Sequence, residues 1–311
     1  MSTFESKLDP LDPKYGVNLV KYPNDKENTW SFPAERDGFV YYYSKTLINK
    51  IFLFKHNEAL YYLSFRWYIA HDSIRNEVDE FKSAIEATIK RNEIPKDWEV
   101  ASIQRWWRSH YDHIHSHHMN EDNKLNPFLR QRIVYPEKLE ADHVVLVDHM
   151  KTIGNLVDGL SKTGTSLVNL SSAWDDYMNM IKPHLLEEEY YGIPLMRAYF
   201  KEQEMSKIVH EIVGSKTAPR EEMGAFIFFL GENKFRYEFM KEHGVPFFVW
   251  WLEFKSKYEY YKTEVMSQLE ALKAGIPPSP PPPKSSNMAQ LLGIAGIALG
   301  LGMYLIRKNS V

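Results

Sequence analysis

The spacing of apolar residues predicts helices along almost the whole chain from residue 46 onward. Within long stretches, apolar residues recur every three or four positions, which is typical of helices that bury one face. No stretch alternates apolar and polar residues as a half-buried strand would, and no hairpin-turn sequence joins two such stretches. We therefore expect an all-α protein whose central helices cover about 47–91, 100–133, 137–161 and 168–191.

Proline and glycine residues mark where these helices should end. Pro95 follows the first helix and Pro136 the second, while Gly192 and Pro194 follow the fourth. Proline lacks a backbone N–H group and its ring clashes with the preceding turn, so it usually ends or bends a helix. For the same reason we expect Pro127 to kink or break the second helix.

Composition and periodicity divide the chain into five segments. The four central helices suit a bundle around one core, and further helices are expected at about 195–213, 221–232, 233–243 and 246–274. The segments are an irregular N-terminal extension (1–45), a four-helix bundle (46–204), an additional helical region (205–275), a proline-rich linker (276–288) and a terminal apolar segment (289–306).

The last two segments predict a membrane anchor. IPPSPPPPKSSN, residues 276–287, is proline-rich and should be extended and semi-rigid. Residues 289–306 carry no charge, and as a helix they would be about 27 Å long, close to the hydrocarbon thickness of a bilayer. A buried core helix is the alternative, but a core helix rarely follows a polyproline linker. We expect a transmembrane tail anchor that crosses the membrane once, with the rest of the chain facing the cytosol.

The same apolar segment indicates the kind of membrane and a route to self-association. It is short, rich in glycine and followed by the basic residues Arg307 and Lys308. These features favour the outer membrane of a mitochondrion, plastid or peroxisome over the thicker plasma membrane. Gly296 and Gly300 form a GxxxG pattern through which two copies could pair as a homo-oligomer.

The composition excludes several classes of site. The formal net charge is −3 at pH 7, so no global positive field indicates a nucleic-acid partner. The chain has no cysteine, which excludes disulfides, iron–sulfur clusters and thiolate zinc sites. No nucleophile–base pair and no glycine-rich phosphate loop is recognisable, so no catalytic or nucleotide-binding residue is predicted. The 12 histidines and 41 acidic residues remain as ligands for a harder metal ion.

Two stretches of the chain share one unusual frame of histidine, acid and proline. HHMNEDNKLNP starts at His117 and HLLEEEYYGIP starts at His184. Each has glutamate four residues after the histidine, a second acid at the fifth position and proline at the tenth. Acidic residues at the surface of helix ends would explain the acids, but not the matching histidine and proline.

This frame favours metal binding because residues four apart lie on one face of a helix. His117 with Glu121, and His184 with Glu188, each offer an imidazole nitrogen and a carboxylate, which suit iron or manganese and are compatible with zinc. His118 with Asp122 is a rival pair on the same helix. We prefer His117 and Glu121 because only they repeat the frame of the second copy.

Other helices should supply further ligands. His143 stands in the apolar run ADHVVLVDHM, where it is either a core histidine or a ligand, and His149 lies nearer the polar face. In the first helix we prefer His71, which is flanked by apolar residues, and keep His56 as the alternative. The remaining histidines near His117 would support the ligands or titrate on a solvated face.

The order of these motifs resembles the hemerythrin-like (HHE cation-binding) domain, over about residues 56–200. The resemblance implies an up-down four-helix bundle around a non-haem di-iron site that two carboxylates bridge. It implies the ligands His71, His117, Glu121, His143, His184 and Glu188. The invertebrate oxygen carriers have a second histidine four residues after the third-helix ligand, where this chain has Val147, so the site resembles the iron- and oxygen-responsive members more closely.

Three hypotheses for function follow. The first is a membrane-anchored iron protein that binds or senses iron, O2 or a related diatomic, with two iron ions or, alternatively, a single iron or manganese. The second is a di-iron oxidase, peroxidase or NO reductase, so whether the chain is an enzyme stays open. The third is a metal-free interaction module tethered to a membrane.

Overall fold

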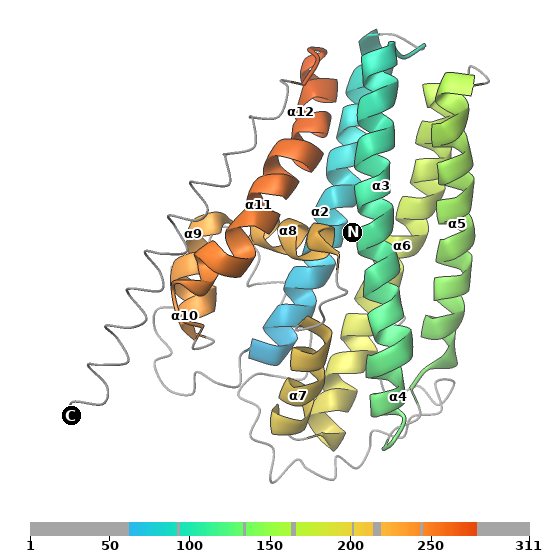
Figure 1. Ribbon diagram of the computed structural model, residues 1–311. Coiled ribbons are helices and arrows are strands. Elements are labelled where there is room, and N and C mark those ends of the chain that lie inside the picture. Colours follow the sequence, from blue (N-terminus) through green and yellow to red (C-terminus); the bar gives the residue numbers. More distant parts are fainter. Residues whose placement is uncertain are drawn as a thin grey trace, which may run out of the picture.

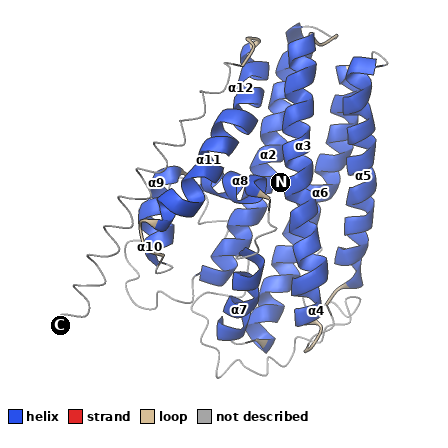
Figure 2. Ribbon diagram, in the orientation of Figure 1, coloured by secondary structure: helices blue, strands red, loops and turns tan. Residues whose placement is uncertain are grey.

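The computed structural model describes residues 62–91, 94–132, 135–162, 166–200, 202–213, 219–242 and 245–278 of the 311-residue chain. Helices joined by short connections make up these ranges, and no β-strand occurs within them (Figure 2). The expectation of an all-α protein is therefore confirmed for the described part of the chain. His56, the extension at 1–45 and the apolar segment at 289–306 lie outside the described residues.

Four long helices lie side by side (Figure 1). They are α2 (Tyr62–Arg91), α3 (Asp97–Asn120), α5 (Glu137–Lys162) and α6 (Leu167–Tyr199). Helix α5 packs against both α3 and α6, and α6 packs against α2. Apolar side chains from all four helices meet in one core, which includes Phe81, Trp106, Ile114, Leu146, Ile153, Trp174 and Ile181.

The second predicted helix changes its helix type just before Pro127, where we expected a kink or a break. After α3, residues Glu121–Leu125 form the π-helical turn η3, and α4 (Asn126–Leu129) follows with Pro127 in its first turn. The N–H of Asn126 bonds to the carbonyl of Glu121, five residues earlier. A π-helical turn often occurs at functional sites, and this one begins at a predicted ligand.

The fourth predicted helix is longer than expected. Helix α6 runs to Tyr199, so Gly192 and Pro194 lie inside it and do not end it. Met196 and Phe200 are buried beyond the proline, and the ring of Phe200 packs 4.9 Å from that of Phe128. Tertiary packing of this last turn therefore outweighs the local preference of glycine and proline to stop a helix.

Helix α7 (Glu202–Val213) packs against α2 and η3 at one end of the bundle (Figure 1). The remaining helices form an arm that packs on one side of α2 and α3. They are α8 (Arg220–Leu230), α9 (Glu232–Lys234), η4 (Phe235–Phe239), α10 (Met240–Glu242), η5 (Trp250–Phe254), α11 (Lys255–Tyr260), η6 (Tyr261–Met266) and α12 (Ser267–Ala274). Helix α12 contacts both α2 and α3, and α8 contacts α2, α3 and α11. A second, smaller core lies within the arm and contains Ile227, Phe235, Met240, Trp250 and Tyr258.

In the part of the chain that the structure describes, no helix is both long enough and apolar enough to cross a membrane.

Candidate metal centre

The structure gathers all six predicted ligands into two neighbouring buried groups, together with one residue that we had set aside. The mixed group consists of His71, His117, Glu121 and Glu188; the histidine group consists of His118, His143 and His184. Within each group, the possible ligand atoms lie within 4.8 Å of one another. Helices α2, α3, α5 and α6, with the π-helical turn η3, supply these side chains, so each group could hold a metal ion.

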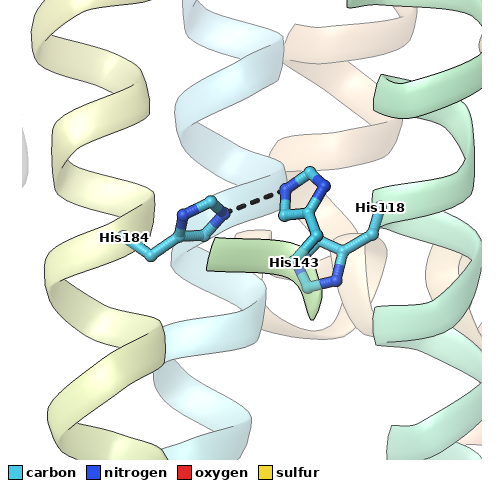
Figure 3. Close-up of side chains that lie close together, drawn as sticks. All are labelled: His118, His143 and His184. Carbon is cyan, nitrogen blue, oxygen red and sulfur yellow. Dashed lines mark hydrogen bonds between the residues drawn. The ribbon is translucent and has the colours of Figure 1, made fainter. Parts of the chain in front are cut away.

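The histidine group draws one imidazole from each of three helices (Figure 3). Nε2 of His143 lies 3.1 Å from Nε2 of His184. The ring of His118 stacks on the ring of His143 at 4.2 Å between centroids. A neutral imidazole carries only one proton on its two nitrogens, so nitrogens that converge in this way suit a shared cation.

Glu121 and Glu188, the two carboxylates of the mixed group, each direct one oxygen to a histidine of their own group and the other to a histidine of the histidine group. Oε1 of Glu121 is 3.4 Å from Nε2 of His117, and its Oε2 is 3.6 Å from Nε2 of His143. Oε2 of Glu188 is 3.5 Å from Nε2 of His71, and its Oε1 is 3.2 Å from Nε2 of His184. Two carboxylates placed in this way could each bridge two metal ions.

Five buried polar atoms of the centre have no hydrogen-bond partner among the described residues. They are Nε2 of His117, Nε2 of His118, Nδ1 of His184, Oε2 of Glu121 and Oε2 of Glu188. A buried polar atom without a partner costs roughly 1–3 kcal/mol in mutational data, so folded proteins rarely leave several in one place. All five are imidazole nitrogens or carboxylate oxygens, the kinds of atom that ligate metals, and the donor set therefore fits a bound metal.

The acid at the fifth position of each frame hydrogen-bonds a ligand histidine from another helix. Oδ1 of Asp122 is 2.8 Å from Nδ1 of His143, and Oε1 of Glu189 is 2.9 Å from Nδ1 of His71. Arg75 also donates to Glu189, at 2.6 Å. Such carboxylates hold the proton on Nδ1 and direct Nε2 toward a metal, which gives a physical reason for the second acid of the repeated frame.

The pKa values show that the metal-free centre holds several protons. Burial alone lowers the pKa of His71, but the nearby carboxylates of Glu121 and Glu189 outweigh burial and raise it to about 9. Burial is likewise outweighed at His143 and His184, mainly by Glu188, and their pKa values rise to about 9 and about 10.

Among the other candidate ligands, the two histidines have lowered pKa values, and the two glutamates shift in opposite directions. Burial, followed by the positive charge of neighbouring histidines, lowers the pKa of both His117 and His118 well below 6.5. Burial also raises the pKa of Glu121, with a further increase from the charge of Glu188. At Glu188 burial is outweighed by His184 and the other histidines, so its pKa is lowered. In order to bind, metal ions must displace the protons of His71, His143 and His184, whose pKa values are raised.

The structure places His117 and His118, which the sequence presents as alternatives, in two different groups. Neighbouring residues on a helix point about 100° apart, and α3 faces α2 on one side and α5 on the other. The ring of His117 lies 5.1 Å from that of His71 on α2, whereas His118 stacks on His143 of α5. The doubled histidine was the available signal, because two adjacent buried imidazoles can serve two adjacent groups. His149 is half-buried elsewhere on α5 and belongs to neither group.

Two of the remaining histidines on α3 form a separate buried network, the Glu77 cluster (Glu77, His110, His113, Tyr177 and Tyr261). Nδ1 of His110 and Nδ1 of His113 lie 2.8 and 3.0 Å from Oε2 of Glu77. The hydroxyl of Tyr261, from η6, donates to Oε1 at 2.5 Å. Burial disfavours the carboxylate, but the charge of His113 and the hydrogen bonds outweigh it and lower the pKa of Glu77 to about 2. Sequence reasoning missed Glu77, which no motif marks.

The structure therefore contains a helical scaffold with buried histidine and glutamate groups that could bind metal. Comparisons of the chain with protein-family models, with curated proteins and with solved structures found no match. The function must be inferred from the donor atoms themselves.

Proposed function

We propose that this chain is a membrane-anchored, hemerythrin-like non-haem iron protein that holds two iron ions and binds or senses O2 or a related diatomic. The observation that carries the proposal is the position of Glu121 and Glu188. Each has one oxygen near a histidine of the mixed group and the other near a histidine of the histidine group. A single metal ion would leave one oxygen of each carboxylate without a partner.

The composition of the donor set supports iron. Five imidazoles and two carboxylates form a nitrogen–oxygen set without thiolate, which suits ferrous iron, with manganese as the alternative metal. Two carboxylates also neutralise half of the charge of two divalent ions in a site that water does not reach. In this proposal His118 supplies an imidazole to the group that contains His143, while Val147, at the position of the second histidine in the oxygen carriers, is exposed.

The arrangement of the helices also supports the proposal. Helices α2, α3, α5 and α6 would be the up-down four-helix bundle of a hemerythrin-like domain, with the ligands projecting inward, as is usual for metal sites in helical bundles. When bound, a pair of ferrous ions would supply electrons to a diatomic ligand. The chain's own residues fix two of the imidazoles, because Asp122 holds His143 and Glu189 holds His71.

The membrane part of the proposal depends on the sequence of residues 276–306 alone. A proline-rich linker followed by 18 uncharged residues supports a tail anchor, with the helical part in the cytosol at the surface of a mitochondrion, plastid or peroxisome. Flotation of the full chain with lipid vesicles, before and after alkaline extraction, tests this part independently of the metal.

The test of the metal centre is metal content together with an optical spectrum, measured on the full chain after anaerobic reconstitution with ferrous iron. We expect about two iron ions per chain, as a dinuclear carboxylate-bridged site requires, and near-ultraviolet charge-transfer bands after exposure to O2. His184→Ala should lose both, while His115→Ala, which changes an exposed histidine on α3, should keep both. A chain that holds no iron under these conditions would contradict the proposal. Sustained O2 consumption would instead favour the oxidase hypothesis.

A further inference from the structure

We propose that an aromatic face on the helical arm, formed by Tyr237, Phe247, Trp251 and Leu252, docks on the interfacial region of a lipid bilayer. This inference rests on the proposed tail anchor and adds to it a second contact, one that would fix how the folded part sits on the membrane.

The exposure of these residues is the first observation. The relative exposure of Phe247 is 79%, of Tyr237 63%, of Leu252 52% and of Trp251 49%. They come from η4, η5 and the turn before η5, which together surround the second core at Trp250. Single exposed apolar residues are normal, but a group of large ones on one small region of a surface marks an interaction site.

The chemistry of the face favours a bilayer as the occupant. The guanidinium of Arg236 lies 5.2 Å from the ring centre of Tyr237 and 5.4 Å from that of Trp251, and Nζ of Lys255 lies 4.6 Å from the Trp251 ring. Tryptophan and tyrosine concentrate at membrane interfaces, where the ring is half in hydrocarbon, and cationic side chains beside them reach the phosphate groups. Phe247 follows Pro246 in a turn and is largely exposed, so it could enter the acyl region.

The length of chain beyond the arm is compatible with simultaneous anchoring and docking. The last helical run of the arm extends from Trp250 to Ala274. At about 1.5 Å per residue, the two ends of this run lie about 37 Å apart. The aromatic face lies at the α10 end of the arm, and the linker starts after the α12 end (Figure 1). Residues 276–288, if extended as polyproline, span about 40 Å. The linker can therefore return the apolar segment to the level of the aromatic face.

The absence of cysteine permits a direct test with single labels. Leu252→Cys in the full chain would carry an environment-sensitive nitrobenzoxadiazole fluorophore, and Asp148→Cys, at an exposed position on α5, would serve as the matched control. Both chains would be reconstituted into phosphatidylcholine–phosphatidylserine vesicles that contain doxyl-labelled lipid. We expect blue-shifted emission and strong quenching by the lipid at position 252 and neither effect at position 148.

Further variants and quenchers separate the outcomes. Adding Phe247→Ser and Trp251→Ser to the labelled Leu252→Cys chain should abolish the quenching by lipid without changing flotation. If the chain floats but the emission and the quenching by lipid are the same at positions 252 and 148, the docking is wrong and the anchor is still supported. A label at position 252 that is shielded from iodide but not quenched by lipid would show that protein covers the face, which also overturns the proposal. A chain that does not float would refute the anchor and the docking together.

Discussion

His118 is the residue whose position in the structure differs most from expectation. It is the only side chain that α3 contributes to the histidine group, and its Nε2 is buried without a hydrogen-bond partner in the described structure. If that nitrogen ligates one of two metal ions, removing it should weaken that ion alone.

We therefore predict that His118→Ala retains about one iron per chain after dialysis, because the substitution removes a direct donor from only one of the two ions. His115→Ala on the same helix should retain two. Isothermal titration with ferrous iron would check the stoichiometry. Two equal sites in the His118→Ala chain would show that His118 is only a core histidine.

The acid at the fifth position of each frame can be tested with a change of a few atoms. Asp122→Asn keeps the shape of the side chain but removes the charge that faces Nδ1 of His143. We expect iron affinity to fall by about 10–100-fold with the fold intact, because the imidazole loses its fixed orientation and part of its basicity.

The control for this substitution is Asp148→Asn on α5, which removes an exposed carboxylate that pairs with Lys151. Competition with a chelator of known affinity measures both variants. Equal affinities in the Asp122→Asn chain and the unaltered chain would mean that the fifth-position acid is merely a surface charge.

Much of the centre could be predicted at the residue scale, because the helical period places residues four apart on one face. His117 with Glu121, and His184 with Glu188, follow from that period alone, and the structure brings both pairs together. His118 and Glu77 could not be found in the same way. Which side of α3 meets α2 and which meets α5 depends on how the helices pack, and one sequence does not specify that packing.

At the scale of elements, Gly224 determines how closely α8 approaches α11 and η6. A Cβ atom at this position would lie 2.7 Å from Cβ of Tyr261 and 2.9 Å from the carbonyl oxygen of Lys257. Neither atom is the end of a flexible side chain, so any added side chain must push η6 and α11 away. Tyr261 also donates the hydrogen bond that joins this arm to Glu77 on α2.

We predict that Gly224→Ala lowers the free energy of unfolding by about 1–3 kcal/mol, as overpacking of a close contact does. Gly154→Ala in α5 is the matched control, since its Cβ would meet only Nε1 of Trp107 at 3.5 Å. That substitution should be neutral or stabilising by about 0.5–1 kcal/mol because alanine is the better helix former. Urea unfolding measures both. A Gly224→Ala chain as stable as the Gly154→Ala chain would contradict the close approach.

The extent of the helices was predictable and their ends were less so. The apolar period indicated the helices that became α3, α5 and α6, because burial of one face persists over many turns. The run of α6 through Gly192 and Pro194 depends instead on a few contacts beyond them, such as that of Phe200 with Phe128. Contacts between residues far apart in the sequence leave no local signal.

For the whole molecule, the protons of the metal-free centre give a dependence of stability on pH. His71, His143 and His184 have folded pKa values of about 9, 9 and 10, above their ordinary value of 6.5. A group whose pKa is raised on folding stabilises the fold fully below pH 6.5, and this contribution is lost as the pH rises through the folded value. The loss therefore falls between pH 6.5 and about 10.

We predict that the melting temperature of the metal-free chain falls across this window, whereas that of the iron-loaded chain falls much less, because its imidazoles are already deprotonated. Calorimetry at several pH values on both forms of the protein would check this. Parallel decreases in the two forms would show that the three histidines do not hold the displaced protons.

The ligands come from four helices between His71 and Glu188, and this spread along the chain has a consequence for the timing of biosynthesis. No shorter piece of the growing polypeptide contains the complete set of candidate ligands, so the proposed metal centre can be completed only after residue 188 has left the ribosome. The apolar segment begins 101 residues later, a delay of about 5–20 s at common rates of translation. Under the proposed function, a newly made chain thus has time to fold and bind metal before the proposed membrane anchor emerges.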